Sequence, residues 1–157
     1  MSTAALVLAA SLASSANAQE REFRLTPAEI SALPGTGAGP GSSGVSGIQT
    51  TVLYGDPTAA GPYTIRIAVP PNTRIAAHSH RDDRTAVVVS GAWYFGYGDP
   101  ARDSLVKPLP PGSYYSEPAD IPHFALTRDA PAVVYIFGLG PTDTVFTATT
   151  PAHSSPP

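Results

Sequence analysis

From residue 48 onward, hydrophobic and polar positions alternate over short distances, and runs of β-branched and aromatic residues are separated by turn residues. In YTIRIAV, residues 63–69, every second position from Ile65 onward is Ile or Val, as expected for a strand with one buried face. Further runs of this kind are IQTTVLYG, TAVVVSG, AWYFGYG, SYYSE, FALT, AVVYIFGLG and TVFTA. Turn sequences such as GDP, PPN and PPG lie between them. Strands at this spacing predict an all-β sandwich or barrel over residues 48–147.

The segment before this region predicts one short helix and a connector. Thr26 precedes Pro27, and Glu29 follows three residues after Thr26, which is the pattern of a capping box with Pro at the first helical position. Pro34-Gly35 ends the helix. The composition of residues 36–47 is that of a flexible linker. Residues 19–47 therefore form a helix and a Gly-rich linker, and the polar, Pro-rich residues 148–157 form a tail.

Residues 1–18 have the pattern of a secretory signal peptide. An apolar stretch over residues 4–13 leads to Ala16-Asn17-Ala18, which fits the small-x-small cleavage pattern, although no positive charge lies near Met1. The apolar stretch is too short to span a bilayer. We expect export to the periplasm or medium and a mature protein outside the membrane. The alternative is a non-polar N-terminal extension of a cytoplasmic protein.

Composition excludes several classes of function. The formal net charge is −3 and no run of Lys or Arg stands out, whereas nucleic-acid binding needs a basic footprint. The chain contains no cysteine, which excludes disulfides, thiolate metal sites and cysteine nucleophiles. Any metal must therefore be held by nitrogen and oxygen. A Ser-His-Asp hydrolase is also disfavoured, because no Gly-x-Ser-x-Gly elbow is present.

The candidate chemistry begins with two histidines in IAAHSHRDDRTAVVVSG, residues 75–91. His78 and His80 point to the same side of a strand, because successive side chains alternate. Two residues span about 6.6 Å of strand, from which two imidazoles can converge on one ion at about 2.1 Å. The third candidate is His123, while His153 in the tail is expected to be solvated.

The order of histidines, glycines and proline resembles the two motifs of the cupin superfamily. The first motif is His-x-His, three or four residues, Glu, six residues and Gly. The second is Gly, five residues, Pro-x-Gly, two residues and His. The positions that match are His78, His80, Gly91, Gly112, Pro118 and His123. The stretches LTPAEI, LPG and VLYGDP also look like those of one group of small bacterial single-domain cupins.

This resemblance, which covers about residues 48–147, implies an antiparallel double-stranded β-helix, a jelly-roll barrel with a metal inside. It implies that His78, His80 and His123 bind a divalent ion, with Fe, Mn, Ni, Cu and Zn not distinguishable. The alternative is a barrel that has lost its metal and whose histidines only line a polar pocket. A homodimer is a reasonable expectation, since cupins often dimerise, and an exposed aromatic strand face would be its surface.

Two positions depart from the family pattern. Arg84 stands where the family usually has its glutamate, and Asp120 stands where the second motif has glycine. Two carboxylates are candidate substitutes, with Glu117 ranked first and Asp83 second, and the alternative is that no carboxylate completes the site. Glu117 is a candidate fourth ligand or base, or else a surface charge on an edge. For Asp82 and Asp83 the favoured interpretation is ion pairing with the neighbouring arginines.

Aromatic residues offer further candidates. Tyr114 and Tyr115 point to opposite faces, and Tyr115 is a candidate catalytic residue if its hydroxyl reaches the pocket. One strand face carries Trp93, Phe95 and Tyr97. The favoured interpretation is that these side chains fill the core, and the alternative is that they form a wall facing the substrate. Phe124 is expected to shield the site from water.

Three classes of function remain open. The first is a metal-dependent enzyme, with an oxygenase (a dioxygenase) acting on a small chelating, enolate-like substrate as the leading version and a metal-dependent isomerase or lyase as a variant. The second is a periplasmic cupin that binds a metal or small ligand without turnover. The third is a structural barrel with a vestigial pocket.

Overall fold

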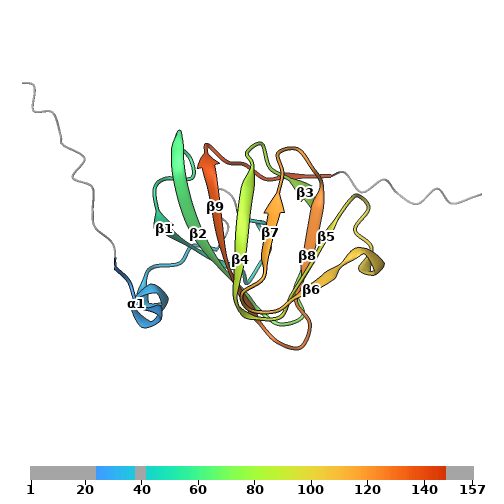
Figure 1. The fold of residues 1–157 in the computed structure, drawn as a ribbon, viewed down its shortest axis with the longest axis horizontal. Helices are drawn as coiled ribbons and strands as arrows, with labels where there is room; N and C mark the ends of the chain where they lie inside the picture. The colour runs from blue at the N-terminus through green and yellow to red at the C-terminus, as the bar shows by residue number, and fades with distance from the viewer. Residues whose placement is uncertain (1–23, 38–41, 148–157) are drawn as a thin grey trace, which may run out of the picture.

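The computed structural model describes residues 24–37 and 42–147. The predicted signal peptide, four residues of the linker and the predicted tail with His153 lie outside these ranges. The first element, α1, spans Pro27–Ala32. Thr26 caps it as predicted: its hydroxyl accepts from the Glu29 backbone N–H, and its own backbone N–H donates to the Glu29 carboxylate at 2.7 Å. None of the residues of α1 is buried, so the helix lies to one side of the barrel (Figure 1).

The predicted all-β barrel is confirmed: the described strands form two antiparallel sheets (Figure 1). The order in the first sheet is β1-β2-β9-β4-β7 and in the second β10-β3-β8-β5-β6. The strands are β1 (Gln49–Tyr54), β2 (Gly61–Val69), β3 (Arg74–Ser79), β4 (Arg84–Gly91), β5 (Trp93–Tyr97), β6 (Lys107–Leu109), β7 (Tyr114–Glu117), β8 (His123–Leu126), β9 (Ala132–Gly140) and β10 (Val145–Phe146), with a 3-10 turn η1 (Asp103–Leu105) before β6.

The core lies between the two sheets, where alternate strand residues meet. In β2 the predicted stripe of Ile65, Ile67 and Val69 is buried, and Tyr63 extends it. From the opposite sheet, Trp93 and Phe95 of β5 fill the interior as expected. Burial of each such side chain contributes about 1.5–3 kcal/mol, so this alternation holds the two layers together.

Two local features differ from the sequence-based expectation. Strand β3 ends at Ser79, so His80 begins the turn that follows rather than continuing the strand. Strand β6 was not predicted, because three residues with Pro108 in the middle carry no strand pattern. Proline is tolerated there because β6 is the last strand of its sheet. No helix in the described ranges is long and apolar enough to cross a membrane.

Candidate metal centre

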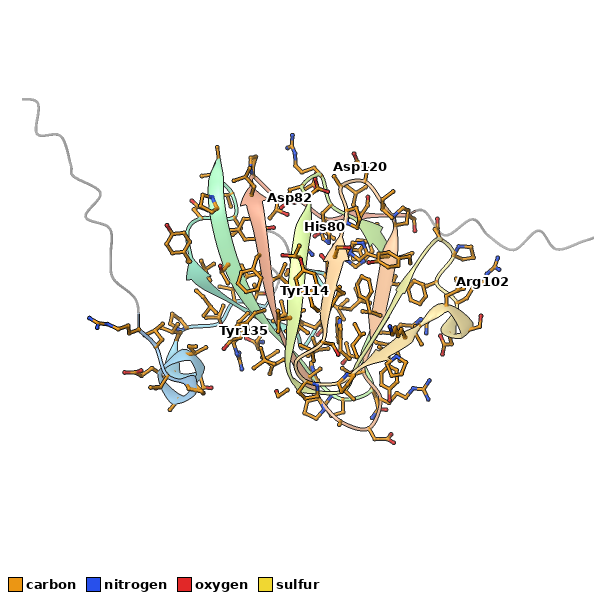
Figure 2. All side chains as sticks on the ribbon, in the orientation of Figure 1. His80, Asp82, Arg102, Tyr114, Asp120 and Tyr135 are labelled. Carbon is orange, nitrogen blue, oxygen red and sulfur yellow. The ribbon has the colours of Figure 1, made fainter. Side chains whose placement is uncertain are left out.

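Three histidines meet at one end of the barrel interior. His78 on β3 and His123 on β8 are direct cross-strand partners, which places both imidazoles on the inner face. His80 joins them from the turn after β3, and Figure 2 shows it near this end of the barrel with Asp82 and Asp120. The possible ligand atoms of the three histidines lie within 4.8 Å of one another, and all three residues are buried. The pairing of β3 with β8 thus brings His123 beside His78 and His80, from which it is separated by more than forty residues in the sequence.

Hydrogen bonds to the backbone fix which ring nitrogen faces the centre. The Nδ1 atoms of His78, His80 and His123 lie 2.7, 2.5 and 3.0 Å from the carbonyl oxygens of Ala76, Asp143 and Ile121. A carbonyl only accepts, so each Nδ1 carries the proton and each Nε2 carries a lone pair. Such bonds orient metal-binding histidines in proteins.

One of these lone pairs has no partner. The Nε2 atom of His123 is buried and makes no hydrogen bond with any described residue. Because an unpaired buried polar atom costs about 1–3 kcal/mol, native structures usually supply a partner. An ion at the centre would supply it.

The three imidazoles are neutral near pH 7. Burial lowers the pKa of His78 to about 4, and His123 adds to the effect. Burial, followed by the Arg84 guanidinium, lowers the pKa of His80 to about 3. Burial also lowers the pKa of His123. Neutral imidazole is the form that binds metal, so the centre needs no deprotonation at neutral pH.

A buried ion pair lies against the histidines. Arg84 on β4 and Glu117 on β7 face each other across the sheet, and both are 3% exposed. The Arg84 Nε atom donates to Glu117 Oε2 at 2.6 Å, and Nη2 contacts the same oxygen. Nη2 also lies 2.7 Å from His80 Nε2, to which it donates. Arg84, which stands at the glutamate position of the first motif, therefore still directs its side chain into the site.

This pairing sets the charge of both partners. Burial alone would raise the pKa of Glu117, but Arg84, and then His123 and His80, hold it at about 2. Burial opposes the charge of Arg84, yet Glu117 raises its pKa above the ordinary value. Both groups are therefore charged, and their charges cancel.

The structure places Glu117, the first-ranked carboxylate, beside the histidines. Its Oε2 atom is 3.8 Å from the Nε2 atoms of both His80 and His123. The second-ranked Asp83 does not reach the centre, because its carboxylate accepts the Ala119 backbone N–H at 2.9 Å.

The expected ion pairs of Asp82 and Asp83 with neighbouring arginines are not found in the described part of the chain. Asp82 is buried and accepts hydrogen bonds from the hydroxyls of Tyr63 at 2.7 Å and Thr142 at 2.6 Å. The reason is geometric: the turn directs both aspartates toward neighbouring segments, while Arg84 points inward to Glu117. The aspartates thus build the turn that holds His80.

Asp120, which stands where the second motif has glycine, adopts a backbone conformation that glycine favours. Its φ angle is +61°, in the left-handed region that glycine adopts most readily. Asp is one of the few other residues that visit this region. Its backbone N–H donates to the His80 carbonyl at 2.8 Å, so this turn also positions His80.

The aromatic candidates divide between the two faces of the sheets. Tyr115 is buried and its hydroxyl accepts from Trp93 Nε1 at 3.1 Å, whereas Tyr114 is exposed. Phe95 stacks on His123, with ring centroids 5.4 Å apart. Phe124 does not shield the centre: as the residue after His123 it points to the other face, where its ring lies against Gly96.

The interior cavity at the centre is small, about 20 Å³, which is room for about one water molecule. Besides His78, His123 and the Arg84–Glu117 pair, Ser43 lines it. The Ser43 hydroxyl is buried and has no hydrogen-bond partner among the residues described. Sequence reasoning missed Ser43, because it lies in a segment whose composition indicates only a linker and no local pattern marks it.

Comparison with known proteins identifies the fold. No protein-family model matches the chain, and no curated protein matches it. Among solved structures, the polyketide cyclase RemF of Streptomyces resistomycificus superposes with a TM-score of 0.59 at 18% identity, covering 83% of this chain and 90% of that one. A sugar phosphate isomerase from a cupin superfamily, from Silicibacter pomeroyi, superposes with a TM-score of 0.54 at 21% identity, covering 75% and 76%. The protein has the cupin fold.

A further solved structure matches over a smaller share of both chains. The DMSP lyase DddQ of Ruegeria pomeroyi superposes with a TM-score of 0.55 at 19% identity, covering 64% of this chain and 51% of that one. The chain thus spans about half the length of the DMSP lyases it matches.

The residues at this centre fit a divalent metal ion. The possible ligand atoms of three neutral imidazoles lie within 4.8 Å of one another, and the Nε2 lone pair of His123 has no hydrogen-bond partner among the described residues. The Arg84 N–H that now bonds His80 Nε2 would have to turn away when an ion binds there. Imidazole suits several metals, so the triad could hold an ion without defining which one.

Proposed function

We propose that this cupin is a metal-dependent enzyme that acts on a small oxygenated, chelating anion. The observation that carries the proposal is that three buried histidines bring their possible ligand atoms within 4.8 Å of one another, and that two of them line a cavity together with a charged pair. When bound, the metal would bind the oxygens of the substrate and accept its negative charge.

The charges in the cavity favour an anionic substrate. The three imidazoles are neutral, and the charges of Arg84 and Glu117 cancel. The charge of the ion itself is therefore uncompensated and attracts a negative ligand. With His80 engaged by the ion, the Arg84 Nη2 donor becomes available to a substrate oxygen.

We expect the reaction to be oxygenation of an enolate-like substrate. Three neutral nitrogen ligands leave coordination positions for both a bidentate substrate and dioxygen, and the cavity of about 20 Å³ would have to widen to admit them. In this role the protein binds and orients: the histidines hold the ion, Arg84 donates to the substrate, and the apolar walls formed by Trp93 and Phe95 exclude water.

A metal-dependent isomerase or lyase is the second candidate, and Glu117 is the observation that favours it. This carboxylate is ionised and lies 3.8 Å from two of the three Nε2 atoms. Because Arg84 holds the pKa of this carboxylate at about 2, Glu117 can accept a proton from a substrate at the centre only when the substrate draws Arg84 away from it. Proteins of similar fold include a sugar phosphate isomerase and DMSP lyases, which supports this reaction class.

Metal content tests the proposal first. The protein is purified, loaded with each candidate metal in turn, and measured by elemental analysis beside H78A and H123A. The matched control is H153A, which removes the one histidine outside the proposed ligand set. We expect about one ion per chain in the wild type and H153A, and loss of the ion in the two site variants. Absence of bound metal under every loading condition would overturn the proposal.

Turnover then separates the reactions. Oxygen uptake is measured with β-diketones, flavonols and phenols, and deuterium exchange at enolisable carbons is followed by NMR. Oxygen uptake that requires His78 and His123 supports the oxygenase. Exchange without oxygen uptake that is lost in E117Q supports the isomerase or lyase. Bound metal with neither activity would identify a binding protein.

We further propose that the protein is exported, on the basis of the pattern in residues 1–18. Expression of the full chain in a Gram-negative host, followed by fractionation and N-terminal sequencing, should yield a periplasmic form beginning at Gln19. An intact chain in the cytoplasm would contradict export.

A further inference from the structure

A second hollow lies where the two sheets part. Strand β7 is the last strand of one sheet and β6 the last strand of the other, and the two are not paired with each other. Between them, beside β5 and η1, is a cavity of about 450 Å³ (Figure 1 shows these elements). We call it the seam groove. Its volume is within the range of about 300–1,000 Å³ typical of small-molecule sites.

The lining of the seam groove is aromatic and partly exposed. Phe95, Tyr97, Tyr114 and Tyr115 contribute to it. Tyr97 is 45% exposed and Tyr114, labelled in Figure 2, is 65% exposed. The Tyr97 hydroxyl donates to the Ser116 carbonyl at 2.6 Å, which bridges the two sheets and holds the ring in place. The groove is therefore a preformed surface for a flat, apolar group.

One cation completes the lining. Lys107, the only lysine in the sequence, is the one charged residue of the groove. Its register partner is Phe95, and it lies on the same side of β6 as the core residue Leu109, but unlike Leu109 it is exposed. No acidic partner is found for it in the described part of the chain. An exposed ammonium group without an acidic partner, beside aromatic rings, suits a ligand with an acidic group.

We propose that the seam groove binds a small planar aromatic acid. The ring packs against the aromatic side chains, and the acid group pairs with Lys107. The groove is separated from the metal centre by Phe95, which lines both cavities and stacks on His123. The two sites are thus adjacent but distinct, and binding in the groove requires no metal.

Calorimetric titration of the EDTA-treated full chain tests this proposal. The probes are 4-hydroxybenzoate and its uncharged analogue 4-hydroxybenzamide. We expect saturable binding of the acid and weaker binding of the amide. Saturation-transfer NMR should detect contact between the bound probe and the protein. Because the protein is metal-free, the result does not depend on the proposed enzymatic function.

Two variants locate the ligand. K107A should weaken binding of the acid by about two- to fivefold, as for an exposed ion pair, and leave the amide unchanged. Y114A should weaken binding of both probes by about two- to tenfold through loss of ring contact. Tyr54 is half-exposed on β1, at the opposite edge of the sheet that contains β7, and it does not line the groove; it supplies the matched control Y54A, which should bind normally.

Three results would overturn the proposal. The first is an absence of saturable binding of either probe. The second is binding that K107A and Y114A leave unchanged but H123A abolishes, which would place the ligand at the metal centre. The third would show that Lys107 serves only to protect the edge of the sheet, because lysine on an edge strand also blocks pairing with other chains. If that is its whole role, K107A raises the oligomeric state by light scattering and leaves acid binding unaltered.

Discussion

Replacing Glu117 by Gln should destabilise the metal-free protein far more than breaking an exposed ion pair of the same length. Gln has nearly the shape of Glu but carries no charge, so the buried Arg84 guanidinium loses the carboxylate that compensates its charge. At the surface, Arg74 and Asp103 are also 2.6 Å apart, with side chains 47% and 62% exposed. D103N is therefore the matched control.

The magnitude follows from burial. Unit charges about 4 Å apart attract by about 4 kcal/mol at an effective dielectric constant of about 20. Removing one partner of a buried pair costs about 3–5 kcal/mol, because the other charge stays buried. An exposed pair contributes about 0–1 kcal/mol. Since domains are stable by about 5–15 kcal/mol, E117Q should remove a large part of the total while D103N changes little.

Urea denaturation of EDTA-treated protein at pH 7, followed by circular dichroism, measures both variants. The double variant R84M/E117L replaces the pair by apolar side chains of similar volume and should recover most of the stability lost in E117Q. Equal losses of less than about 1 kcal/mol in E117Q and D103N would refute the reasoning, because they would mean that water screens the buried pair.

Three further predictions concern stability. Because the pKa of His78 falls from 6.5 to about 4 on folding, the unfolded chain binds more protons between these values, and the unfolding free energy of metal-free protein should fall as pH drops through this window. A flat profile of unfolding free energy from pH 7 to 4, measured by urea titration, would contradict this. Gly91 and Gly112 have φ angles of +78° and +86°, but only at Gly91 would a Cβ overlap a backbone carbonyl. G112A should therefore cost about 1–2 kcal/mol and G91A considerably more, and equal melting temperatures would show that the overlap is relieved. S43A removes a buried, unpartnered hydroxyl and should leave the unfolding free energy unchanged or raise it by up to about 1–3 kcal/mol; a clear loss would reveal a bonding partner.

Much of the architecture followed from local pattern. Alternation in residues 63–69 predicted a strand with one buried face, and the Thr26–Glu29 spacing predicted the capped helix. Both depend on neighbours within one strand or one helical turn, so the sequence itself contains the information. The three-residue strand β6 was missed, because its pairing with β5 and not its own composition defines it.

For the centre, the sequence determined which residue types were available, and the tertiary structure decided how they meet. His78, His80 and His123 were named from spacing and from likeness to a family. That Arg84 faces Glu117 depends on the register of β4 with β7, and that Ser43 enters the same cavity depends on where the N-terminal segment crosses the barrel. Side-chain periodicity along a strand is local, whereas register between strands is set by packing of the whole core. The sequence alone therefore predicted a histidine site in a barrel, and only the folded chain showed that a buried arginine–glutamate pair shares it.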